Sequence, residues 1–227
     1  AIYTGESYKK VTDAVEAASK LADNATDEAK VAAATAINNA IKALEKVSEA
    51  AIVKNLHELT EALADPNVQF IQLGADIEVS DYLNVTRDVT IYGEGYNITR
   101  SVSEATDNES YVVMVSAGKL TAKNLNLASI NTQSQPIANA VGITVQSGAS
   151  LDFDGGTITA SSENRSAYGV YAQSGAAAVS VTNTEFVLTA VPEDRYEIAI
   201  GLETADKNNV DPFSILTKEG NTIPTEA

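Results

Sequence analysis

The chain has 227 residues, enough for one large domain or two small ones, and it is 44% hydrophobic but 6% aromatic, so its core must be mainly aliphatic. Its formal charge of −16 disfavours nucleic acids and anionic membrane surfaces as partners. The chain has no cysteine, which excludes disulfides and thiolate metal sites, and no apolar run long enough to insert into a membrane.

The first 50 residues carry a helical pattern. Two apolar stripes are separated by capping residues between Asn24 and Glu28. We therefore expect residues 1–50 to form an α-helical hairpin that acts as a linker or docking element. Two helices alone leave apolar surface open, which leaves three alternatives: packing on the cap of the following structure, a small bundle with a neighbouring domain, or self-association through residues 1–50. The stripes are Val11, Ala14, Val15, Ala18 and Leu21, and then Val31, Ala34, Ile37, Ile41, Leu44 and Val47 or Ser48.

A short capping helix is predicted near residues 55–65. Asn55 and Glu58 have the spacing of a capping box. Asp65 and Pro66 end the helix, because the residue before a proline disfavours the helical conformation. We expect this helix to close the open end of the structure that follows, with an apolar face made of Leu56, Leu59 and Leu63.

From about Phe70 the apolar period changes to two, and short strands alternate with turns that contain glycine. Residues 140–149 and 167–176 are near copies, and a weaker copy is aligned from Ala199. Such a repeat, carried by strands, predicts a solenoid of parallel coils with three strands per coil. Aligning the coils predicts two inward columns, which are Leu120, Leu151 and Val179, and Ala122, Phe153 and Val181.

Polar insertions recur at one point in each coil, just before its first strand. Insertions at one corner should project from one side of a solenoid, where functional surfaces are commonly found. We therefore expect a functional side of the solenoid that is bordered by residues 103–110, 131–139, 161–166 and 192–196.

Two pairs of residues are candidates for ligand binding. Tyr168 and Tyr171 flank a glycine, and outward tyrosines can stack on sugar rings. Asp152 and Asp154 leave the same face of a strand, so they could bind Ca²⁺ or act as an acid–base pair. The predicted rung neighbours of these aspartates are a lysine and hydroxyls, which favours a surface pair between Lys123 and Asp154. The residues predict no catalytic group, no metal ligand set and no cofactor, with Ca²⁺ left open.

The stretch LHELTEALADPNVQFIQLGADIEV, which begins at Leu56, resembles the opening of pectate-lyase-like right-handed parallel β-helix modules. The strand pattern from Leu83 to Gly93 continues the likeness, which extends over about residues 53–215. The resemblance implies that residues 51–227 form a right-handed parallel β-helix with the capping helix at its start. Such modules occur in bacterial cell-surface and S-layer-associated proteins, where they are regarded as adhesive.

The enzymes of this superfamily group acidic Ca²⁺ ligands with an arginine, or carry further acidic and histidine motifs, and this sequence departs from those patterns. We therefore expect a secreted, non-catalytic bacterial surface module that binds a glycan or a surface protein. Two alternatives stay open. One is a lyase or hydrolase that acts on acidic polysaccharide, and the other is a structural stalk or assembly unit.

Overall fold

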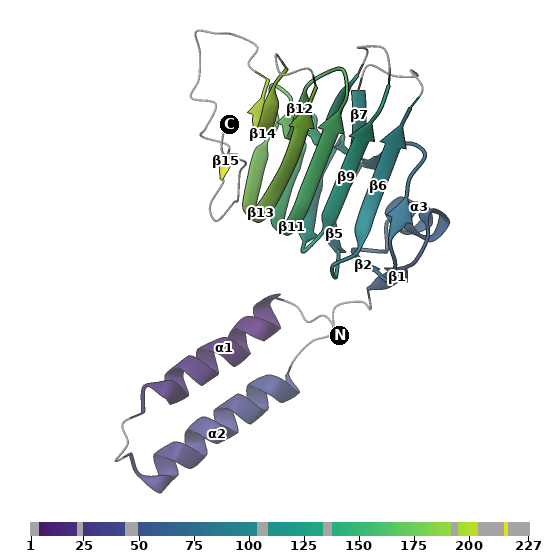
Figure 1. The fold of residues 1–227 in the computed structure, drawn as a ribbon. Coiled ribbons are helices and arrows are strands. Elements are labelled where there is room, and N and C mark those ends of the chain that lie inside the picture. Colours follow the sequence, from purple (N-terminus) through teal and green to yellow (C-terminus); the bar gives the residue numbers. More distant parts are fainter. Residues whose placement is uncertain are drawn as a thin grey trace. The chain divides into compact units, whose positions relative to one another are not determined.

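The computed structural model describes residues 5–21, 25–43, 50–103, 109–133, 138–191, 195–203 and 216–217. The chain divides into two compact units, residues 1–50 and 51–227. The first unit contains helices α1 (Gly5–Ser19) and α2 (Asp27–Lys42). The second unit is mainly β and contains helix α3 (Leu56–Ala64) followed by a solenoid of parallel strands (Figure 1).

The helical hairpin is present, but of the predicted α2 stripe only Ile37 is half-buried among the described residues, and Val31, Ala34 and Ile41 are exposed. On α1, Val11 and two alanines are half-buried as expected, whereas Val15 and Leu21 are exposed. On α2, Val31 and Ile41 are 65% and 48% exposed. Small side chains allow two helices to approach closely, so an alanine-rich face of α2 is half-buried instead. That face consists of Ala29, Ala33, Ile37 and Ala40, and the predicted Leu44 and Val47 lie outside the described residues.

Helix α3 begins with the predicted capping interaction. The side chain of Asn55 accepts a hydrogen bond from the Glu58 N–H at 2.9 Å, and Glu58 Oε2 accepts one from the Lys54 N–H at 2.7 Å. At the other end, the Arg87 guanidinium donates to the carbonyl groups of Ala62 and Leu63 at 2.8 and 3.1 Å. A cation at this end also complements the helix dipole. Both ends of α3 are thus fixed by side chains.

The strands form two sheets, and all the strand pairs described within each sheet are parallel. The five-stranded sheet contains β14 (Glu197–Leu202), β12 (Ala167–Ala172), β10 (Asn139–Val145), β7 (Glu109–Val115) and β4 (Leu83–Val85), in that spatial order.

The ten-stranded sheet folds around two faces of the solenoid. Its first face contains β1 (Ala51–Val53), β2 (Phe70–Leu73), β5 (Val89–Tyr92), β8 (Lys119–Lys123), the first parts of β11 (Ser150–Ser162) and β13 (Ala178–Ala190), and β15 (Leu216–Thr217). Its second face contains β3 (Ile77–Glu78), β6 (Asn97–Val102), β9 (Asn126–Asn131) and the second parts of β11 and β13. Each coil therefore has three strand segments, and the predicted parallel β-helix is confirmed.

The predicted inward columns are present in the core. Leu151 pairs with Leu120 on one side and with Val179 on the other, and Phe153 pairs in the same way with Ala122 and Val181. All six side chains are at most 1% exposed. At the N-terminal end, Leu59 is 0% and Leu63 8% exposed, and both belong to this core, while Leu56 packs against it only partly buried. The predicted closure of the first coil by α3 is therefore confirmed.

The corner between the two faces of the ten-stranded sheet uses left-handed backbone conformations. Asn124 and Asn183 have φ values of 48° and 52°, and the corresponding corner of β11 is formed by Gly155 and Gly156. Asparagine and glycine adopt this region more readily than other residues. These residues let β11 and β13 turn the corner and remain continuous strands.

Candidate functional site

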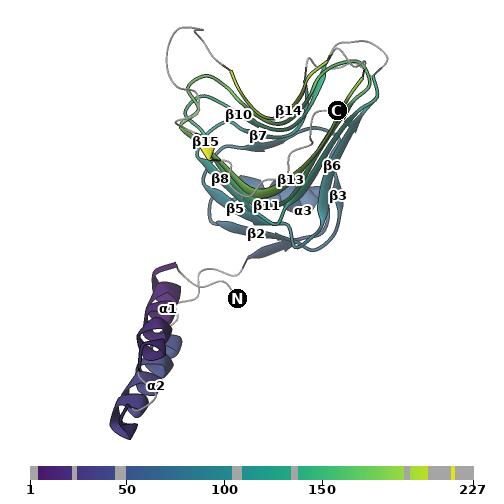
Figure 2. The same ribbon diagram turned by 60° about the vertical axis from the view of Figure 1, so that its left-hand side comes forward.

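The outward surface of the five-stranded sheet is concave, as Figure 2 shows for β7, β10 and β14. On β10 and β12 a glycine of the repeat lies at this bend, where there is no room for a side chain. A Cβ atom on Gly142 would lie 2.4 Å from Ile158 Cγ2, and one on Gly169 would lie 2.4 Å from the Phe186 ring. Each glycine is followed by a second core-facing residue, which interrupts the alternation of the strand. The strands therefore bend toward the core at these positions and leave a hollow outside.

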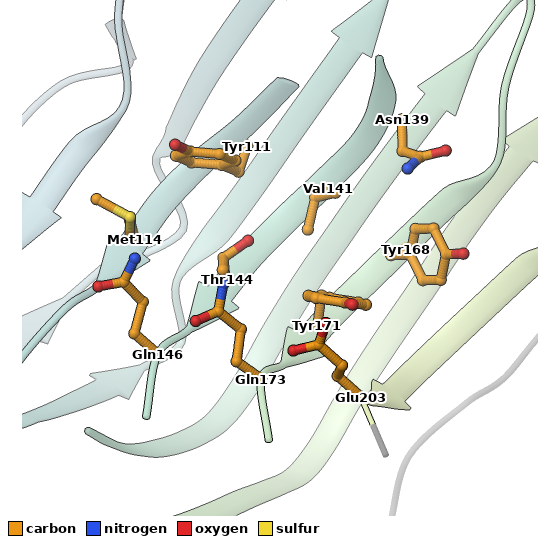
Figure 3. Close-up of a pocket in the computed structure, with 10 residues that line it drawn as sticks. All are labelled: Tyr111, Met114, Asn139, Val141, Thr144, Gln146, Tyr168, Tyr171, Gln173 and Glu203. Atoms are coloured by element: carbon orange, nitrogen blue, oxygen red, sulfur yellow. The ribbon is translucent and has the colours of Figure 1, made fainter. Parts of the chain in front are cut away.

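This hollow is a groove with a volume of about 400 Å³ that crosses β7, β10 and β12 and ends at Glu203, the residue after β14. We call it the tyrosine groove, and Figure 3 shows the side chains that line it. The register places them in rows along the solenoid axis, because equivalent residues of successive coils are paired. The lining residues are Tyr111, Met114, Asn139, Val141, Thr144, Gln146, Tyr168, Tyr171, Gln173 and Glu203.

One row of the groove is aromatic and apolar. Val141 pairs with Tyr111 on one side and Tyr168 on the other, so the two rings stand two strands apart, about 9.6 Å. Val141 is 2% exposed and forms the floor between them. The rings of Tyr168 and Tyr171 are in edge-to-face contact, with centroids 5.6 Å apart. Figure 3 shows the Tyr168 ring nearly face-on and the Tyr171 ring edge-on, which gives the groove a flat ring beside an upright one.

A second row is polar and follows the ends of the same strands. The backbone N–H groups of Gln146, Gln173 and Glu203 donate to the neighbouring coil, which fixes these residues on successive rungs. Figure 3 shows their side chains in line. Strands in a sheet are about 4.8 Å apart, so hydrogen-bonding groups recur along the groove at that interval. Glu203 Oε2 also accepts a hydrogen bond from the Ser174 N–H at 3.3 Å.

A buried arginine supports the aromatic row from inside the solenoid. Arg100 on β6 is 3% exposed, and its Nη1 donates to the Tyr111 carbonyl at 2.9 Å. Its guanidinium carbon lies 6.0 Å from the centre of the Tyr111 ring, and the Tyr82 ring packs against the Tyr111 ring with their centroids 4.7 Å apart. Arg100 also pairs with Asp81 at 3.4 Å. Tyr111 is thus held on its backbone and beside its ring.

The two aspartates predicted as ligand-binding residues lie elsewhere, on the first face of the ten-stranded sheet. Their rung neighbours are those predicted, and the Lys123–Asp154 pair is present with a separation of 3.1 Å. Asp152 pairs with Lys119 at 3.3 Å. Hydrogen bonds from Asn183, then Lys123 and Thr182, lower the pKa of Asp154 from its ordinary value. Each aspartate therefore has a lysine partner, and neither lines the tyrosine groove.

The structure brings together Tyr168 and Tyr171 but adds residues that the sequence reasoning missed. Gln146 and Gln173 occupy the same place in the two near copies, and this identity was the available signal. The third copy was aligned two residues too late, because Glu197, not Ala199, pairs with Ala167. A shift of two keeps each residue on its face, so alternation alone could not detect the error. Of the predicted border insertions, residues 104–108, 134–137 and 192–194 lie outside the described residues.

Residues 50–168 match the family model described as "Putative pectate lyase-like adhesive domain", and they make up more than half of the chain. The chain belongs to this family. No curated protein and no solved structure matches it. The match to the adhesive-domain family includes β1, α3 and the coils as far as Tyr168, so the family resemblance seen in the sequence is confirmed.

No described helix is long and apolar enough to cross a membrane. No group of three or more His, Asp or Glu residues is placed to hold a metal ion in the part of the chain that the structure describes.

Proposed function

We propose that this adhesive domain is a non-catalytic module of a bacterial cell surface and that the tyrosine groove binds an extended glycan chain. The observation that carries the proposal is the pairing of an aromatic row with a parallel row of amide side chains on one concave face. Tyrosine rings offer apolar area for the C–H faces of sugars, and amides both donate and accept hydrogen bonds to hydroxyl groups. Membership of an adhesive family supports binding as the role of this face.

The direction of the groove supports a linear ligand. Both rows run along the solenoid axis, and each coil contributes one residue to each row. Tyr111 and Tyr168 are separated by two rungs, a length comparable to the disaccharide repeat of an extended glycan. A sugar chain lying along the axis could therefore place every second sugar on a tyrosine ring while polar side chains of successive coils bind its hydroxyl groups.

The proposal is tested by glycan binding of matched tyrosine variants. Tyr168→Ala should weaken binding of the glycan that an array identifies by about tenfold, because truncating an aromatic anchor commonly costs more than about 1 kcal/mol. Tyr92→Ala is the control, since Tyr92 lies on the first face of the ten-stranded sheet, outside the groove. Equal effects of both variants would contradict the assignment of the groove.

The enzyme alternative is tested with the aspartate pair. The wild-type protein should release no products from polygalacturonate, with or without Ca²⁺, and Asp152→Asn with Asp154→Asn should change glycan binding by no more than a few-fold. Both aspartates lie outside the groove and have lysine partners. Polyuronate cleavage that disappears in the double variant would overturn the non-catalytic proposal.

A further inference from the structure

The tyrosine groove has one charged end. Glu203 is exposed, and the other described side chains that line the groove are uncharged. Figure 3 shows Glu203 reaching toward Tyr171 at the end of the polar row. Elsewhere on the solenoid Asp152 and Asp154 have lysine partners, but within the described residues no lysine or arginine pairs with Glu203. Its carboxylate is therefore a local negative charge inside the groove.

The polar row changes its chemistry at this end. Gln146 and Gln173 can both donate and accept hydrogen bonds, whereas an ionised carboxylate only accepts them. A ligand group at Glu203 must therefore be a donor. An ammonium group offers several donors together with the opposite charge, and hydrogen bonds between charged groups are the stronger kind. The adjacent Tyr171 ring adds an attraction for a cation over its face.

The net charge of the chain acts in the same direction. A net charge of −16 favours cations over polyanions as ligands. An acidic polysaccharide would bring its carboxylates next to Glu203, which is unfavourable, and an acetylated amino group would offer one neutral N–H there. The positive charge of a free amino sugar is favoured both by the net charge of the chain and by the Glu203 carboxylate.

We propose, building on glycan binding in the tyrosine groove, that this groove selects glycans with free amino groups, of the glucosamine type, and that Glu203 is the residue that recognises the ammonium group. A glycan is favoured over a lysine-rich peptide because Tyr168 presents its ring flat over the sheet beside the apolar floor at Val141. Such a ring matches the flat C–H face of a sugar, whereas lysine side chains are flexible and need no platform.

The test compares glucosamine oligosaccharides with N-acetylglucosamine and galacturonate oligosaccharides of equal length by calorimetry. The measurements are made on the full chain at about 0.15 M salt, where charges farther apart than about 8 Å are largely screened. Wild-type protein should bind the glucosamine oligosaccharide about fivefold more tightly than the N-acetylated one, as expected for one exposed ion pair. Galacturonate oligosaccharides should bind most weakly.

Two charge-matched variants separate the local from the general effect. Glu203→Gln should remove the preference for the free amine. Glu185→Gln removes the same charge from an exposed position on the second face of the ten-stranded sheet, outside the groove, so this variant should keep the preference. A preference that survives Glu203→Gln, or equal wild-type affinity for both amino-sugar chains, would overturn the inference. An oligolysine peptide that binds more tightly than the glucosamine chain would overturn the choice of a glycan.

Failure of this inference can be told apart from failure of the proposed function. If the N-acetylglucosamine chain binds, if its binding is weakened by Tyr168→Ala, and if the glucosamine chain does not compete with it, the groove binds glycans but does not select free amines. If none of these chains binds and no array glycan depends on Tyr168, the proposed function itself falls.

Discussion

The two units of the chain bury their apolar side chains in different ways. In the solenoid an inward residue has an equivalent residue on the next coil to either side, as Leu151 has in Leu120 and Val179. These three side chains are at most 1% exposed. In the hairpin, by contrast, α2 has no buried residue, and Val31 is 65% exposed. Stacking in one dimension gives each strand two neighbours, whereas a helix of a hairpin has one.

This difference indicates where stability and recognition reside. The apolar core of the second unit runs from Val53 to Ala199 and is built from columns of aliphatic residues. We expect its stability to depend on those columns, on the α3 cap and on the glycines that shape the groove. The exposed apolar residues of the hairpin leave the unit with surface for a partner or a second copy, which is the docking role expected for residues 1–50.

The largest expected effect on stability is at Phe153, the bulkiest side chain of the inward columns. Phe153→Ala should lower the free energy of unfolding by about 3–5 kcal/mol, because the large ring leaves a cavity. Phe153 is 0% exposed, and its rung neighbour Ala122 is too small to fill the space. Urea denaturation measures the change, with Phe70→Ala, on the outer surface of β2, as the control. Equal losses in both variants would show that the columns do not dominate stability.

The next effect is at the cap. Leu59→Ala should cost about 2–4 kcal/mol, since Leu59 is 0% exposed and closes the first coil. Leu56→Ala should cost less, because Leu56 packs against the core only partly buried. Thermal unfolding followed by circular dichroism ranks the two variants. An unchanged midpoint for Leu59→Ala would place the cap outside the cooperative unit.

The same contrast explains which predictions from the sequence held. The rung pairs of β8, β11 and β13 could be predicted, because period-two alternation and an internal repeat both constrain the register, whereas the weaker copy in β14 was misaligned by two residues. The face of α2 that packs against α1 could not be predicted. Hydrophobicity alone favours the larger Val31 and Ile41, whereas close packing of the two helices favours the alanine-rich face. The tyrosine groove was predicted only at Tyr168 and Tyr171. Its concavity depends on contacts of Gly142 and Gly169 with another sheet, and a single strand does not reveal them.

A smaller effect is expected at the glycine that shapes the groove. Gly169→Ala should cost about 1–3 kcal/mol, because the new Cβ would lie 2.4 Å from the Phe186 ring and 2.6 Å from the Ala199 carbonyl oxygen. Gly201→Ala is the matched control for stability alone, since its Cβ would have ordinary contacts of 3.4 Å or more, two of them with the Tyr168 ring. Glycan affinity should fall in Gly169→Ala. A stable Gly169→Ala protein with normal binding would show that this glycine does not set the curvature.

A pH-dependent effect below about 1 kcal/mol is expected at Asp154. Hydrogen bonds from Asn183, Lys123 and Thr182 hold the pKa of Asp154 below its ordinary value of 3.8 in the native state. The stabilisation is therefore present above that value and lost as the pH falls through the lowered native pKa. The Asp154 side chain is 36% exposed, so water screens the pair with Lys123 and keeps the effect small.

Urea unfolding of wild-type protein and Asp154→Asn between about pH 2 and pH 7 measures this effect. The difference in free energy should be constant near neutral pH and should shrink in acid. A difference that grows in acid would contradict the sign.

The smallest effect on the solenoid should come from the largest change to the chain, removal of residues 1–50. The core columns, the cap and the groove are all formed by residues after position 50. The truncated chain should therefore keep its β signal in circular dichroism, and its unfolding midpoint should move little. Light scattering should instead report a change in association, because the exposed Val15, Val31 and Ile41 are removed. Loss of the β signal would mean that the hairpin belongs to the folding core, and the division into two units would then be wrong.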